Sequence, residues 1–107
     1  MNHASTDLKL DKKTRELFRA ILSLRNTSEC QQFFRDLLTS DEIREFGERW
    51  YVAQCVDKGL SYREISALTG LSTTTVTRVA KWLKQGSGYQ LALKRQKKAE
   101  NISARRT

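Results

Sequence analysis

Hydroxyl and basic side chains gather in one short stretch of the sequence, residues 61–84, which reads SYREISALTGLSTTTVTRVAKWLK. A hydroxyl can bond a phosphate or a base edge, and a threonine methyl can pack on a thymine methyl. An arginine can pair with guanine through two parallel hydrogen bonds. This combination favours contact with DNA. The candidate DNA-binding residues are Arg63, Ser72, Thr73, Thr74, Thr75, Thr77, Arg78 and Lys81.

The sequence offers little that could catalyse a reaction. Catalysis needs a positioned acid, base or nucleophile, but the chain has a single histidine, His3, and no glycine-rich phosphate loop. Asp and Glu mostly accompany Lys and Arg on predicted helix faces, where surface pairing is usual. Cys30 and Cys55 lie far apart and are expected to be small buried residues in a reducing compartment. We therefore predict no enzymatic activity and no metal site.

The stretch also carries the signals of two short helices joined by a turn. Ser61 and Glu64 form the S-x-x-E pattern of a capping box, which begins a helix. Gly70 supplies a residue that tolerates positive φ, where a helix can end at low cost. Ser72 can cap a second helix that extends to about Gln85. These signals predict a helix-turn-helix over residues 61–84.

Apolar residues in the two predicted helices recur at helical spacing. Ile65 and Leu68 lie on the first helix, and Val76, Val79 and Leu83 form one stripe on the second. If these residues are buried, the candidate binding residues lie at the start or on the outer face of the second helix. A helix-turn-helix places that helix in the major groove of DNA. The alternatives are an ordinary helical hairpin, or a helix-turn-helix that contacts a protein such as the transcription machinery, although protein-contact faces usually carry bulky apolar anchors.

The net charge of +8 lies entirely in the part of the chain that begins with this motif. Residues 1–60 contain ten basic and ten acidic side chains, whereas residues 61–107 contain ten basic and two acidic ones. A neutral half joined to a basic half is typical of a protein that binds a polyanion. DNA is favoured over an acidic membrane, because no stretch is long or apolar enough to span one. A basic surface that serves only solubility is the remaining alternative.

The whole sequence is typical of an all-α protein. It has no proline, is rich in helix-forming residues and lacks alternating strand patterns. Residues 1–10 are expected to be a flexible N-terminus, residues 11–93 the helical domain for DNA binding and dimerisation, and residues 94–107 a basic tail. The first residues are too polar for a secretory signal, so we predict a cytoplasmic protein.

Capping residues predict where the other helices begin. We expect the first helix to begin near Asp11, the second at Ser28, and the third at Thr39 or Ser40, with the third ending at Gly59. Each of these helices carries apolar residues at helical spacing. The residues expected on buried faces are Leu17, Phe18, Ile21, Leu22, Leu24, Phe33, Phe34, Leu37, Leu38, Ile43, Phe46, Trp50, Ala53 and Val56.

The chain carries a heavy load of large aromatic side chains for its size. Helix-turn-helix proteins usually bind as two-fold dimers, because one recognition helix reads too few base pairs to specify a site. We therefore expect a homodimer in which part of this aromatic surface faces a second copy. The alternative is that all of it fills a monomeric core. The residues are Phe18, Phe33, Phe34, Phe46, Trp50 and Tyr51.

A short glycine-containing linker, residues 86–88, precedes a last helix that begins at Tyr89 and gives way to the basic tail. The tail either follows the phosphate backbone as a flexible arm or is only a solvated helix end. Its basic residues are Lys94, Arg95, Lys97 and Lys98.

The stretch from Leu38 to Lys84 resembles the bacterial tryptophan repressor family. The family's helix opening, L-T-x-x-E-R-x-x-x-G-x-R, is similar to LTSDEIREFGER at residues 38–49. Its helix-turn-helix, S-Q-R-E and a hydrophobic residue followed by a glycine turn and a T-I-T-R segment, is similar to SYREI at residues 61–65, Gly70, and TVTR at residues 75–78. Each motif alone is moderately specific, but the two in this order are strong.

The resemblance implies an all-helical homodimer of about six helices per chain, with the N-terminal helices of the two copies interleaved. It implies that residues 61–84 read a DNA operator. By matched position, Arg78 and the cap residues would lie close to the DNA backbone. The residues nearest the bases would be Arg63, Thr73, Thr74 and Thr77.

The resemblance also implies a place for an effector. The family holds L-tryptophan between the third helix and the recognition helix, with two arginines around its indole. Arg49 and Arg78 match those arginines, and Thr39 matches a threonine at the pocket edge. The family has a glycine that leaves room for the ligand, and this chain has Val79 at the matching position. One turn further on, the family has a small serine, and this chain has Trp82. We therefore expect no cofactor: L-tryptophan is disfavoured, and the recognition helix is held in place without it. One alternative is that the pocket binds a different metabolite. Another is that Trp82 is only a core residue.

Overall fold

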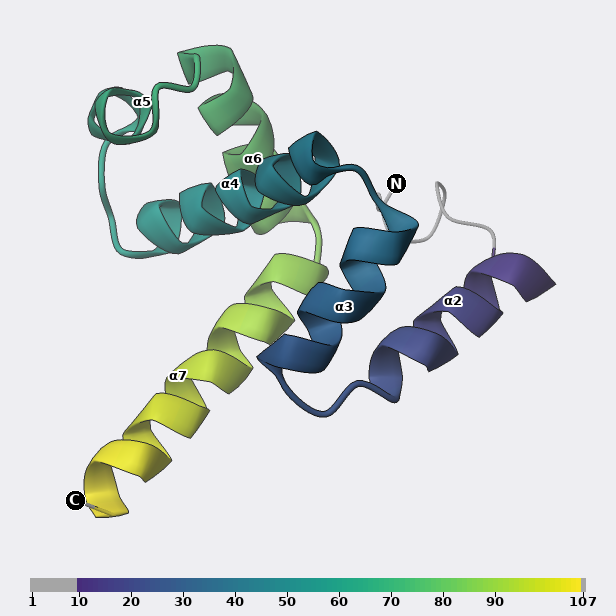
Figure 1. Ribbon diagram of the computed structural model, residues 1–107. Helices are drawn as coiled ribbons and strands as arrows, with labels where there is room; N and C mark the ends of the chain where they lie inside the picture. The colour runs from purple at the N-terminus through teal and green to yellow at the C-terminus, as the bar shows by residue number, and fades with distance from the viewer. Residues whose placement is uncertain (1–9, 107) are drawn as a thin grey trace.

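The computed structural model describes residues 10–106, with side chains as far as residue 102, and this part of the chain consists of α-helices and short connections. Figure 1 shows α4, α5 and α6 as one lobe, with α2 and α3 to one side and α7 extending away from it. The predicted all-α fold of about six helices is confirmed. The predicted flexible N-terminus, residues 1–10, lies outside the described residues except for Leu10. The helices are α2 (Lys12–Leu22), α3 (Thr27–Leu37), α4 (Ser40–Asp57), α5 (Tyr62–Thr69), α6 (Thr73–Gln85) and α7 (Gly88–Arg106).

Side-chain caps begin the helices from α2 to α6. The predicted cap at Ser28 is wrong, because the side chain of Asn26 accepts a hydrogen bond from the backbone N–H of Glu29 at 2.9 Å. Asparagine caps a helix as well as serine does, so α3 begins before Ser28, which lies within its first turn. The other caps are predicted residues: Asp11, Thr39, Ser61 and Ser72.

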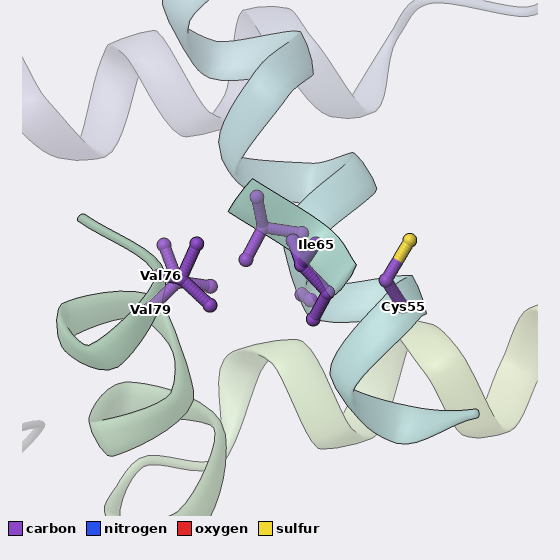
Figure 2. Close-up of a cluster of buried hydrophobic side chains, with 6 residues drawn as sticks. Cys55, Ile65, Val76 and Val79 are labelled. Atoms are coloured by element: carbon purple, nitrogen blue, oxygen red, sulfur yellow. The ribbon is translucent and has the colours of Figure 1, made fainter. Parts of the chain in front are cut away.

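The core joins α4 to the helix-turn-helix. Figure 2 shows Cys55, Ile65, Val76 and Val79 converging from these three helices. Full burial of a valine or isoleucine side chain contributes about 1.5–3 kcal/mol. Ile65 and Val76 are both fully buried, so they hold α5 and α6 on α4. The buried cluster consists of Val52, Ala53, Cys55, Ile65, Val76 and Val79.

The apolar faces predicted for α2, α3 and the first half of α4 are not buried within one chain. Neither α2 nor α3 contains a buried residue, and Leu22 is 83% exposed. Of the predicted stripe of α4, Phe46 is exposed and Ala53 alone is buried, and Tyr51 is exposed as well. On α5, Leu68 is 62% exposed although it shares helical spacing with Ile65. These residues do not fill the core of a single chain.

The last helix is much longer than predicted. α7 runs without interruption to the end of the described residues, so positions 94–106 belong to a helix. Of the two alternatives for the basic tail, the structure has the helix end and not the flexible arm. Several contacts hold α7 to the body of the protein, among them a hydrogen bond from Nε2 of Gln90 to the backbone oxygen of Leu83 at 2.6 Å. The ring of Tyr89 stacks on Trp50 with centroids 6.2 Å apart, and Nζ of Lys97 pairs with Oδ2 of Asp57 at 2.5 Å.

Candidate nucleic-acid interface

The start of α6 presents hydroxyl and basic side chains to solvent. The hydroxyl of Ser72 caps the helix by accepting the backbone N–H of Thr75 at 3.2 Å. Apolar residues between Val76 and Leu83 hold the opposite side of α6 in the core, so the polar side chains turn outward. The predicted DNA-binding residues that are exposed are Arg63, Ser72, Thr73, Thr74, Thr77, Arg78 and Lys81.

The threonines of α6 are not equivalent. Thr75 is half-buried, and its hydroxyl lies 3.1 Å from that of Ser72. Thr77 is exposed, but its hydroxyl donates to the backbone oxygen of Thr73 at 2.7 Å. The hydroxyl proton of Thr77 is thus used within α6, and the side chain offers a partner its oxygen lone pairs and its methyl group. Thr73 and Thr74 are the exposed threonines at the very start of the helix.

The local structure of α5 and the turn fixes how α6 is presented. The backbone N–H of Ser61 donates to the Glu64 carboxylate at 3.0 Å, and the Ser61 hydroxyl accepts the Glu64 N–H at 3.1 Å, which confirms the predicted capping box. Hydrogen bonds to the Glu64 carboxylate, first from the Ser61 backbone N–H and then from the Ser61 side chain, hold the pKa of Glu64 below its ordinary value because they favour the charged form. Gly70 ends α5 with φ of +76°, and the Ser66 hydroxyl donates to the Leu71 oxygen across the turn at 2.5 Å.

Residues 61–87 form the head of the molecule, and its electrostatics are positive. The head contains four basic side chains and one acidic one, and that acid is the capping-box Glu64. Nζ of Lys81 lies 5.4 Å from the centroid of the Trp82 ring. Nζ of Lys84 donates to the Tyr62 hydroxyl at 3.4 Å, which ties the last turn of α6 to the start of α5. The head therefore offers an anion a rigid, positive and hydroxyl-rich surface.

A hollow of about 510 Å³ lies between α4 and α6. Thr39, which was predicted at its edge, does not line it. The Thr39 hydroxyl caps α4 by accepting the Glu42 N–H at 3.1 Å. The other predicted pocket residues, Arg49, Arg78, Val79 and Trp82, do line the hollow. Lining residues that the sequence patterns did not indicate are Glu45, Glu48, Leu71 and Tyr89, and Thr75 also lines it.

Val79 and Trp82 line this hollow in different ways. Val79 is buried in the core, whereas Trp82 is half-buried and forms one wall. Tyr89 of α7 lines the same hollow and stacks on Trp50. No local pattern could have placed Tyr89 there, because it lies far along the chain from α4 and arrives only when α7 packs. The result is an aromatic wall beside an arginine, Arg49.

Three further observations bear on the class of site. No helix within residues 10–106 combines the length and apolar character needed to cross a membrane. The described side chains hold no group of three or more His, Cys, Asp or Glu placed to bind a metal ion. Cys55 is buried as predicted, Cys30 is half-buried, and both are free thiols.

Comparison with known proteins finds one family and several relatives. Residues 12–97 match the model of the Trp repressor protein family. The uncharacterized protein YerC of Bacillus subtilis (strain 168) is 40% identical over 94 residues, which are 87% of this chain and 90% of that protein.

Two solved structures share the fold. A TrpR-like protein from Eubacterium eligens ATCC 27750 superposes with a TM-score of 0.77 at 34% identity, over 81% of this chain and 91% of that one. A candidate Trp repressor from Staphylococcus aureus also superposes with a TM-score of 0.77, at 40% identity, over 81% of this chain and 88% of that one.

Proposed function

The chain belongs to the Trp repressor family, and we propose that it is a sequence-specific DNA-binding transcription regulator, acting as a repressor that reads a two-fold operator as a homodimer. The observation that carries this proposal is the exposed hydroxyl and basic surface at the start of α6, which two capped helices and a buried core hold in place. The proposed site of action is the cytoplasm, where free thiols such as Cys30 and Cys55 stay reduced.

In the proposed complex, the first turn of α6 enters the major groove. Arg63, Thr73, Thr74 and Thr77 contact base edges, while Ser72 and Arg78 hold phosphates. Arg63→Ala should then cost about 1–3 kcal/mol of binding free energy and relax specificity at one base position. Lys81→Ala, the matched control, should weaken binding evenly across sequences. A uniform loss for Arg63→Ala in competition binding would assign it to phosphate instead.

A homodimer is proposed because one chain leaves so much surface uncovered. The chain exposes 8835 Å², against roughly 6,100 Å² for a compact monomer of this mass. Its radius of gyration is 15.6 Å, against about 13 Å for a compact chain of this length. The excess area is of the order that permanent homodimer interfaces bury.

The proposed seat of the second copy is a groove of about 1,090 Å³ between α3 and α4. Gly47 lines it, and a Cβ added to Gly47 would meet no atom within 4 Å. Glycine inside a helix costs about 0.5–1 kcal/mol, and nothing within the described chain requires it there. Close approach of a helix from the second copy, such as the uncovered α2, accounts for it. The apolar lining residues are Cys30, Phe34, Leu38, Ile43, Phe46 and Trp50.

The decisive experiment is selection of bound sequences from a random DNA pool, with and without L-tryptophan. The proposal expects enrichment of an inverted repeat, because a two-fold dimer reads each half-site once. Enrichment of a single half-site would contradict the dimeric reading. No enrichment at all would reject operator binding and favour a helix-turn-helix that contacts a protein.

For regulation, we propose that L-tryptophan is not the effector and that α6 is held without a bound ligand. Support comes from Val79, which belongs to the buried cluster, and from Trp82 and Tyr89, whose rings line the hollow where the family resemblance implies small neighbours for the ligand. Calorimetry with millimolar L-tryptophan should show no saturable heat. The variant to compare with the wild type is Trp82→Ser, which removes the indole that lines the hollow. Saturation of the wild type in the micromolar range would overturn this part of the proposal.

A further inference from the structure

α7 concentrates more positive charge than the helix-turn-helix does. Residues 88–107 contain six basic and one acidic side chain, a net charge of +5, whereas residues 61–87 contain four and one, a net charge of +3. Four of the six fall within five consecutive positions, which span about 6 Å of the helix axis. Such charge density is typical of contact with a polyanion. The four are Lys94, Arg95, Lys97 and Lys98.

α7 carries this charge away from the surface that α6 presents. α6 begins at one end of the molecule, and α7 continues beyond the other end of α6 (Figure 1). With 13 and 19 residues, the two helices are about 20 and 28 Å long, and the longest dimension of the molecule is 42 Å. A duplex that lies against the start of α6 is therefore remote from the outer half of α7.

The charged part of α7 is anchored and lines a hollow. Lys97 pairs with Asp57 at the end of α4, yet its side chain remains 61% exposed. A shallow hollow of about 480 Å³ runs along this part of the helix, with Lys94, Lys98 and Asn101 among its lining residues. Asp57 is the only acidic residue among the described side chains that line it, and its charge is already matched by Lys97. Within the same described part of the chain, neither Lys94 nor Lys98 forms an ion pair.

We propose that the outer half of α7 binds the phosphate backbone of a second nucleic-acid duplex, so that one protein molecule bridges two duplex segments. The exposed apolar residues of α7, Leu91 and Ile102, lie about 16 Å apart along the axis. That spacing does not provide the continuous apolar centre of a protein interface. Duplex DNA presents one negative charge per about 1.7 Å of its axis, which suits closely spaced lysines. The proposal rests on the proposed function only for the first duplex, which the head reads.

A duplex-capture assay with the full chain tests this proposal. One short duplex of random sequence is immobilised, and a second, fluorescent duplex is supplied free. The variant Lys94→Gln/Lys98→Gln removes two exposed charges and keeps good helix formers. We expect the wild type to retain the free duplex and the variant to retain at least about tenfold less at 0.1 M salt. The salt slope of second-duplex binding should become shallower by about 1.8.

Two control variants separate this proposal from the proposed function. Lys12→Gln/Lys13→Gln removes two exposed charges from the first turn of α2 and should leave capture unchanged. Arg63→Ala/Arg78→Ala should abolish sequence preference while α7 still binds random duplex. A wild type without sequence preference would reject the proposed function but not the bridging proposal. Retention of the free duplex by Lys94→Gln/Lys98→Gln at the wild-type level would overturn the bridging proposal. A lower sedimentation mass of that variant would also overturn it, because α7 would then be a contact between copies.

Discussion

Residues 10–51 and residues 52–93 are built from the same kind of helix but reach different states within one chain. Both parts have side-chain N-caps and apolar residues at helical spacing. Every buried side chain among the described residues nevertheless comes from position 52 onward. In the first part, large residues such as Leu22 and Phe46 remain exposed.

An amphipathic pattern therefore identifies an apolar face but does not show whether that face is buried within its own chain. α5 and α6 pack on the second half of α4, where Val52 and Cys55 belong to the same buried cluster as Ile65. α2 makes only slight contact with the rest of the described chain, and α3 contacts the first half of α4. The helix-turn-helix is thus buried against α4 within one chain, whereas the N-terminal helices leave large apolar residues such as Leu22 exposed.

The largest expected effect is a loss of stability in residues 52–93, the part whose apolar residues are buried within one chain. Ile65→Ala removes a fully buried side chain and should lower the free energy of unfolding by about 3 kcal/mol. The matched control is Leu68→Ala on the same helix, which should cost about 0.5 kcal/mol because Leu68 is exposed. Urea unfolding at one fixed protein concentration measures both, since the stability of an oligomer depends on concentration. Equal losses of stability in the two variants would show that the buried and the exposed face of α5 contribute equally.

The next effect concerns the association of residues 10–51, the part whose apolar residues are exposed in one chain. Phe46→Glu places a charge in the groove between α3 and α4 and should raise the dissociation constant of the proposed dimer roughly 100-fold. Sedimentation velocity across a concentration series measures this change, and circular dichroism should show retained helix content. Leu68→Glu, on an exposed apolar position outside the groove, should leave the mass unchanged. A wild-type mass of one chain at micromolar concentration would contradict the proposed dimer.

A smaller effect separates the two capping boxes. Ser61→Ala and Thr39→Ala each remove the hydroxyl that accepts a backbone N–H, and each should cost about 1 kcal/mol of stability. Only Ser61→Ala should also weaken DNA binding, because Ser61 begins α5 in the head whereas Thr39 begins α4. Thermal melts and DNA titrations of the two variants test this. The same loss of DNA affinity in both would show that the head does not behave as a separate unit.

The smallest effect is a dependence on pH. Hydrogen bonds from Thr39 and Ser61 hold the pKa of Glu42 and of Glu64 below the ordinary value. Each carboxylate therefore stabilises the fold fully above the unfolded pKa of about 4.3, and this contribution is lost as pH falls through the lower folded pKa. The melting temperature should fall more between pH 6 and pH 3 for the wild type than for Glu42→Gln/Glu64→Gln. Parallel curves for the two proteins would show that these two carboxylates are not the source of the pH dependence.

Much of the head was predictable because its signals are local. The capping box of Ser61 with Glu64 joins residues three apart, and the positive φ of Gly70 is a property of one residue. The cap at Ser72 is equally local. The start of α3 shows the limit, since Asn26 and Ser28 are both good caps and only backbone geometry chooses between them.

Composition, caps and helical spacing are enough to establish an all-helical chain, the start of most of its helices and the positive charge after residue 60. Packing in three dimensions determines which apolar faces are covered, brings Tyr89 to the hollow beside Trp82 and pairs Lys97 with Asp57. Caps and turns depend on residues a few positions apart, whereas packing depends on the angles between helices, which bring together side chains from distant parts of the chain.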